Sequence, residues 1–268
     1  MLRKLLKYDF RAVIKPWLIG LVVMLALSFV GCFGVSIMKS ARKFDELILL
    51  FGTLSIAGSF FAFGAFFLMT EIILAIRFYK NFFTDEGYLT FTLPVKLHTH
   101  INSKLILSMV MLTMSTVAII VGVMIVLMVP GVLKFSDLGL LWSLIPNKGW
   151  AVLYIVEILA LLLMSSLFAV LFLSCCITFG SVIVKKGKAL AAFGVYYGAN
   201  SIFSVVTSIF YMFGIPSLGL WMARPEFLNK VTGGVALLLL GCICFMALLS
   251  SLLYILQYRL LDRKLNLP

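Results

Sequence analysis

The chain has 268 residues, of which 63% are hydrophobic and only 12% are charged, and its formal net charge is +12. An ordinary soluble domain carries about 45–50% apolar and about 25% charged residues, so this composition excludes that class and points to a protein embedded in lipid. Lysines and arginines that flank membrane spans and face anionic lipids explain the positive charge, and we therefore expect membrane lipids as partners and no nucleic acid.

The first sixteen residues predict an amphipathic helix. Apolar side chains recur at helical spacing between five basic residues, and Pro16 predicts the end of this helix because an interior proline removes a backbone hydrogen bond. We expect residues 1–16 to lie on the inner surface of the membrane, with the apolar face in the lipid.

Six apolar segments follow, and each is long enough for a membrane-spanning helix, which needs about 17–25 residues. They cover residues 17–38, 47–76, 102–129, 150–180, 189–215 and 233–257. The predicted fold class is an all-α integral membrane protein, and residues 1–268 are predicted to form a single transmembrane domain.

The basic residues predict which side of the membrane the termini occupy. The flanks that share a side with the termini hold fifteen of the 22 lysines and arginines, and the opposite flanks hold the other seven. Because cytoplasmic flanks carry the excess of positive charge, both termini are predicted to be cytoplasmic. This predicts a multi-pass membrane protein; a bacterial plasma membrane is implied only by the resemblance described below.

Motifs for catalysis and nucleotide binding are missing from the sequence. Gly187-Lys188 is not a phosphate-binding loop, because it continues into alanine and has no glycine five positions before Gly187. His98 and His100 have no carboxylate beside them, and the five cysteines have no metal-binding spacing. We therefore expect no enzymatic activity, no cofactor and no metal site in this chain.

Two acidic residues interrupt the apolar segments, and a carboxylate in the hydrocarbon core is costly. Glu157 lies roughly 10 Å inward from Trp150 on a regular helix, which fits either a polar point on a substrate path or a partly hydrated group near the outer surface. Glu71 lies six residues before Arg77, and we interpret it as a structural residue near the cytoplasmic end of its span.

The fifth apolar segment carries a possible contact surface for another helix. Gly194 and Gly198 are four residues apart and are followed by Asn200, so one face is small and partly polar. Such a face lets another backbone approach closely, and it predicts a helix interface.

The connection between the second and third spans contains the most informative segment. Thr84 can cap a short helix over residues 84–93, Asp85 and Glu86 suit its positive N-terminal end, and Pro94 stops it. The side chains of Tyr88, Leu89, Phe91 and Leu93 would then lie at the cytoplasmic membrane surface. They could dip into lipid headgroups or dock in the groove of a partner protein.

The run Phe78-Tyr79-Lys80-Asn81 and the run from Thr84 to Val95, TDEGYLTFTLPV, resemble a stretch in permease subunits of bacterial ABC exporters, especially those of Gram-positive bacteria. The resemblance is closest to the membrane subunit of Pmt-type exporters of phenol-soluble modulins, which are small amphipathic peptides. It implies a second copy or homologous permease subunit, two ATPase subunits that bind ATP and Mg²⁺, and an amphipathic peptide as substrate.

The same resemblance implies that the 84–93 helix couples ATP hydrolysis to transport. The coupling residues would be Thr84, Asp85, Glu86, Tyr88, Leu89 and Phe91. Two other interpretations stay open at this point. One is a membrane component that senses or confers immunity to peptides without moving them, and the other is an intramembrane enzyme.

Overall fold

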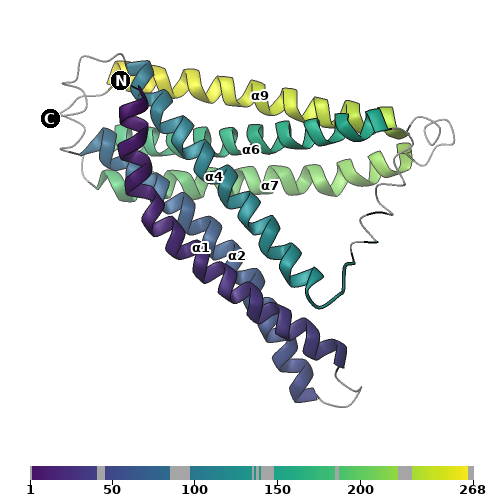
Figure 1. The fold of residues 1–268 in the computed structure, drawn as a ribbon. Coiled ribbons are helices and arrows are strands. Elements are labelled where there is room, and N and C mark those ends of the chain that lie inside the picture. Colours follow the sequence, from purple (N-terminus) through teal and green to yellow (C-terminus); the bar gives the residue numbers. More distant parts are fainter. Residues whose placement is uncertain are drawn as a thin grey trace. The chain divides into compact units, whose positions relative to one another are not determined.

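The computed structural model describes residues 2–40, 46–84, 97–134, 136, 139, 148–184, 187–222 and 231–264. Long helices make up nearly all of these ranges, and no β-strand occurs in them. The helices are α1 (Leu2–Ser40), α2 (Glu46–Phe83), α4 (Leu97–Met128), α6 (Lys148–Ile183), α7 (Lys188–Met222) and α9 (Val231–Lys264) (Figure 1).

All six helices are long and apolar enough to cross a membrane. They contain between 32 and 39 residues, which corresponds to about 48–58 Å against a hydrocarbon core of about 30 Å. The chain is therefore a multi-pass helical membrane protein, and the predicted fold class is confirmed at that level. The excess length places helix ends outside the hydrocarbon or requires the helices to tilt.

The predicted end of the first helix at Pro16 is wrong. Helix α1 continues through Pro16 as one element (Figure 1). Its buried face also continues across this position, because Asp9, Val13 and Trp17 follow one another at four-residue intervals and are all buried. Neighbouring helices can compensate for the backbone hydrogen bond that a proline removes from a membrane helix. Residues 2–16 are thus the first part of the long helix α1.

The described helices group into two compact units. The first unit contains Met1–Ile76 and Thr99–Leu144, and the second contains Arg77–His98 and Ile145–Pro268. The chain therefore passes between the units within α2 and again within α4. A single permease domain over residues 1–268 stays a prediction.

Buried polar contacts join the three helices of the first unit. Trp17 of α1 donates its indole N–H to the hydroxyl of Ser115 on α4 at 2.7 Å, and this hydroxyl lies 3.1 Å from that of Thr70 on α2. All three side chains are buried. Hydrogen bonds between membrane helices contribute about 0.6 kcal/mol on average, so this cluster fixes the relative register of the helices more than it adds to their stability.

Small residues let α1 and α2 approach closely. A methyl group at Gly34 would lie only 2.8 Å from the carbonyl oxygen of Gly52. The association of membrane helices depends on such close packing, because lipid tails are as apolar as leucine and provide no hydrophobic driving force.

Helix α4 ends in a regular capping motif. The backbone N–H of Gly131 donates to the carbonyl of Met128 at 2.8 Å, and that of Val132 donates to the carbonyl of Leu127 at 3.0 Å. This pattern requires a left-handed residue, and Gly131 has a φ of 67°. The ammonium group of Lys39 on α1 also donates to the carbonyl of Pro130 at 2.8 Å.

The second unit contains α6, α7 and α9. Helix α6 packs against both of the other helices. A methyl group at Gly180 of α6 would lie 2.5 Å from the Cα atom of Ala192 on α7, so these two backbones touch. On the α9 side, the buried hydroxyl of Ser174 donates to the side-chain oxygen of Gln257 at 3.1 Å.

Candidate functional site

Only one of the predicted coupling residues lies in the part of the chain that the structure describes. Thr84 follows the last residue of α2, and its hydroxyl donates to the carbonyl of Lys80 at 2.6 Å. This bond caps the end of α2, whereas the sequence predicted that Thr84 caps the start of the next helix. The remaining coupling residues lie outside the described residues: Asp85, Glu86, Tyr88, Leu89 and Phe91.

The end of α2, directly before this segment, is firmly packed. Phe78 and Phe82 are buried, and their ring centroids are 4.8 Å apart. Asn81 between them is buried as well. The end of α2 is therefore well packed.

The start of α4, directly after this segment, is held by α9. The imidazole of His98 stacks on the ring of Tyr258 with centroids 4.1 Å apart and an interplanar angle of 8°. Its Nδ1 atom also lies 3.0 Å from the hydroxyl of Tyr254, within hydrogen-bonding distance. Tyr254 and Tyr258 are one helical turn apart, so α9 contacts this imidazole with two successive turns.

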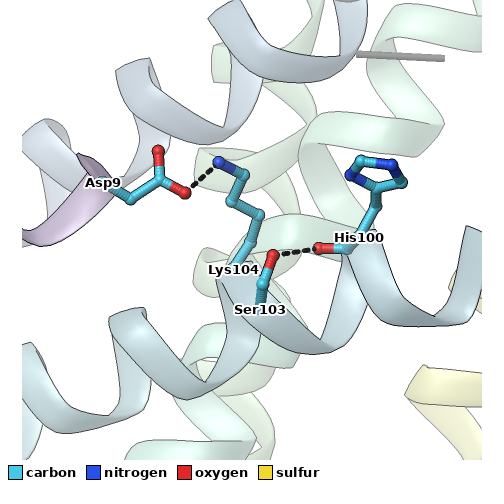
Figure 2. A network of polar contacts seen from close by, with 4 residues as sticks. All are labelled: Asp9, His100, Ser103 and Lys104. Atoms are coloured by element: carbon cyan, nitrogen blue, oxygen red, sulfur yellow. Dashed lines mark hydrogen bonds and ion pairs between the residues drawn. The ribbon is translucent and has the colours of Figure 1, made fainter. Parts of the chain in front are cut away.

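An ion pair is buried within the first unit, near the predicted cytoplasmic end of the spans. Lys104 of α4 donates from its ammonium group to the carboxylate of Asp9 on α1 (Figure 2). The side chains are only 8% and 6% exposed, respectively. Removing either partner would leave a buried charge without its counterion, which typically costs about 3–5 kcal/mol. The pair therefore connects α1 to the beginning of α4.

His100 lies one helical turn before Lys104 and is also buried. Its side chain is 1% exposed, and neither ring nitrogen has a hydrogen-bond partner within the described part of the chain. Its carbonyl accepts a hydrogen bond from the hydroxyl of Ser103 at 2.8 Å (Figure 2). A neutral imidazole carries one donor and one acceptor, and a protonated one carries two donors, so this position has unused hydrogen-bonding capacity in either form.

Sequence reasoning missed the pairing of Asp9 with Lys104. From the sequence alone, Lys104 is one of the fifteen basic residues in the predicted cytoplasmic flanks, and no role follows for Asp9. A signal was present, because Asp9 is the only acid among the basic residues of the first sixteen positions, and Lys104 interrupts the start of an apolar segment.

The structure places Glu157 in a buried position on α6. The residue is 5% exposed, and neither carboxylate oxygen has a hydrogen-bond partner in the described ranges. The interpretation as a partly hydrated surface group is therefore disfavoured. A buried carboxylate without a partner is costly in a membrane and marks a candidate point on a substrate path.

We expect the substitution Glu157→Gln to reduce export while leaving membrane insertion normal. Glutamine keeps the size of the side chain and one acceptor oxygen, but it replaces the other oxygen by an NH2 donor and removes the charge. Export by intact cells and the amount of chain in the membrane fraction are the two measurements. Unchanged export with normal insertion would leave Glu157 with a structural role alone.

The other acidic residue, Glu71, is half-buried in α2 and has at least one polar or electrostatic interaction. The structural role that the sequence suggested stays a prediction.

The predicted interface glycines lie on an exposed face of α7. Gly194, Gly198 and Asn200 are all exposed, and a methyl group at either glycine would meet no atom of the described residues within 4 Å. Within the second unit, the backbones of α6 and α7 approach closely at Gly180 instead. At these two glycines, no described residue covers the small and polar face of α7. By mean hydropathy, α7 is also the least apolar of the six spans.

The described residues contain no group of three or more histidine, cysteine or acidic side chains that could hold a metal ion. All five cysteines belong to the described helices, and all are free thiols. Cys32 is buried against α4, and its thiol lies 3.4 Å from the carbonyl of Ile125. Cys32, Cys175 and Cys176 therefore pack as small buried side chains, whereas Cys242 and Cys244 are exposed.

Comparison of the chain with protein-family models, with curated proteins and with solved structures gives no match.

Proposed function

We propose that this chain is the membrane-spanning subunit of an ATP-driven exporter that moves amphipathic or hydrophobic peptides out of a bacterial cell. The observation that carries this proposal is the segment between α2 and α4, which contains TDEGYLTFTLPV and resembles the coupling region of ABC exporter permeases. At the end of α2 before this segment, Phe78 and Phe82 are buried, and at the start of α4 after it, His98 stacks on Tyr258 of α9. Anchored ends suit a segment that receives force from a partner.

Separate ATPase subunits would bind ATP and Mg²⁺, since the sequence has no phosphate-binding loop of its own. Both termini and the segment 84–93 would lie on the cytoplasmic side, where these subunits are found. The first part of α1, with its five basic residues, would extend along the inner membrane surface.

A second copy or a homologous permease subunit would cover the open face of α7. Gly194 and Gly198 allow a close backbone approach there, and Asn200 offers a hydrogen-bonding side chain. A polar face of this kind is costly against lipid, so a protein partner or water has to cover it.

The proposal is tested with the double substitution of Tyr88 and Phe91 by alanine. Large aromatic side chains that fill a partner's pocket typically contribute about 2 kcal/mol or more to binding. We therefore expect the proposed ATPase partner to co-purify in much smaller amounts, or to lose its stimulation by substrate. Membrane insertion should stay normal, because both side chains lie outside the predicted spans.

The matched control replaces Phe33 and Phe61 by alanine. These rings are exposed and lie within the spans, far along the chain from residues 84–93. The control should retain the ATPase. If the Tyr88/Phe91 variant keeps both the bound ATPase and its substrate response at the level of the control, residues 84–93 are a lipid anchor and the coupling assignment is wrong.

A further inference from the structure

One face of α6, within the second unit, carries two aromatic rings and a buried carboxylate in successive turns. Trp150, Tyr154 and Glu157 are four and three residues apart, so their directions around the helix axis differ by no more than about 60°. The rings of Trp150 and Tyr154 have centroids 6.3 Å apart and an interplanar angle of 35°. All three residues are buried or half-buried, whereas the residues directly before and after Glu157 are exposed. The three side chains therefore share the inward face of the helix.

The carboxylate of Glu157 lacks a partner on this face. The residue is 5% exposed, and neither of its oxygens has a hydrogen-bond partner among the described residues. Burying a charge in a membrane is costly unless an opposite charge pairs with it, and acidic residues in spans accordingly mark binding sites and ion paths. A cation from outside the chain can supply this pairing.

The two rings favour an organic cation over a metal ion. The faces of tyrosine and tryptophan rings attract an ammonium group that lies within about 6 Å of the ring centroid. Residues three apart on a helix have Cβ atoms about 5–6 Å apart, so an ammonium group paired with Glu157 comes within reach of Tyr154. Calcium takes about six to eight oxygen ligands, which one carboxylate beside two rings does not supply.

The same face of α6 continues inward as an aromatic surface. Phe168 lies eleven residues after Glu157, which corresponds to about 16 Å along the axis and to a direction only about 20° away. The ring centroids of Phe168 and Phe172 lie 5.8 and 6.2 Å from that of Phe203 on α7. A ligand whose cation reaches Glu157 can therefore lay an apolar part along this face, so the ligand that fits is amphipathic.

We propose that Trp150, Tyr154 and Glu157 bind the primary ammonium group of an amphipathic molecule, and that the aromatic surface at Phe168 takes up its apolar part. Lysine side chains of amphipathic peptides supply this chemistry, and so do alkylamines. The assignment to a lysine of the exported peptide rests on the proposed function, whereas the ammonium site itself does not.

Binding is measured with the purified chain in nanodiscs of uncharged lipid, without any ATPase, and empty nanodiscs give the background. The probes are a fluorescent amphipathic helical peptide with lysines on its polar face and the same peptide with every lysine acetylated. Loss of one partner from a desolvated charge pair strongly weakens binding, so we expect the native chain to prefer the lysine peptide by about 10-fold or more. The substitution Glu157→Gln should abolish this preference.

Three further substitutions separate recognition of the ammonium group from general damage. Glu157→Asp keeps a carboxylate and should retain most of the preference. Trp150→Leu should weaken binding of the lysine peptide by about 2- to 30-fold, the range for cation–π contacts, and leave the acetylated peptide unaffected. Glu46→Gln removes an exposed carboxylate of the first unit and should change neither affinity. Equal binding of both peptides by the native chain, or an undiminished preference in Glu157→Gln, would overturn the ammonium site.

A second pair of probes separates the two sources of the ammonium group. Dodecylamine is compared with dodecanol, which has the same length and no charge. A preference for the amine that depends on Glu157, together with the preference for the lysine peptide, supports the assignment. If only the amine is preferred, the site binds small amines and the assignment to a peptide lysine is wrong.

Failure of the site and failure of the proposed function give different results. If Glu157 confers the preference for the lysine peptide but the chain with its proposed ATPase partner moves no peptide, the site stands and the export function fails. If ATP-driven uptake occurs at equal rates for the lysine and the acetylated peptide, the export function stands and the role of the site in substrate selection is wrong.

Discussion

Removing either partner of the buried ion pair between Asp9 and Lys104 is expected to destabilise the chain by about 3–5 kcal/mol. Asp9→Leu removes the carboxylate that pairs with the buried Lys104 ammonium, and Lys104→Met removes the ammonium that pairs with the buried Asp9 carboxylate. The double substitution Asp9→Leu with Lys104→Met removes both charges and should restore much of the loss, since replacing a buried pair by apolar residues is often neutral.

Unfolding of the purified chain in detergent micelles, followed during titration with SDS, measures these free energies. The two single substitutions and the double substitution form a cycle that isolates the interaction between the two side chains. Additive effects in this cycle, with single losses below about 0.5 kcal/mol, would show that the pair is exposed to water and contributes little.

The contact between α6 and α7 is expected to be weakened by one added methyl group. The substitution Gly180→Ala places a Cβ atom 2.5 Å from the Cα atom and 2.7 Å from the backbone nitrogen of Ala192. Backbone atoms cannot move aside as a flexible side chain can, so the two helices have to separate. Overpacking of this kind costs about 1–3 kcal/mol, and a larger residue such as leucine should cost more.

The matched control is Gly241→Ala in α9, where the added methyl group meets no described atom within 4 Å. It should be neutral or stabilise the chain slightly, because alanine loses less backbone freedom than glycine on folding. The same SDS titration compares both variants. Equal stability of the two would contradict the close approach of α6 to α7.

The helices could be predicted from the sequence because their signal is local. Each apolar segment is continuous and longer than the membrane requires, so its presence does not depend on what it contacts. The exact ends depend on neighbouring helices, and this explains the error at Pro16. The buried face of α1 continues across the proline, and packing against other helices outweighs the lost backbone bond.

The contacts between helices could not be predicted in the same way. The spacing of Gly194 and Gly198 suggested a close helix contact, but the close approach within the second unit occurs at Gly180, which has no such spacing motif. Asp9 and Lys104 are 95 residues apart, and nothing local connects them. A costly charge such as Glu157 can be recognised from the sequence, whereas its burial depends on the three-dimensional packing.

The central claim is that this chain forms a transport path and relies on a partner for ATP hydrolysis. Its most direct test uses inside-out vesicles that contain the purified chain with or without the proposed ATPase partner. The two quantities measured are ATP hydrolysis and uptake of an amphipathic test peptide. We expect uptake only when the chain, the ATPase, ATP and Mg²⁺ are all present, and no ATP turnover by the chain alone. ATP turnover by the chain alone, or hydrolysis by the full complex without any peptide uptake, would contradict the proposal.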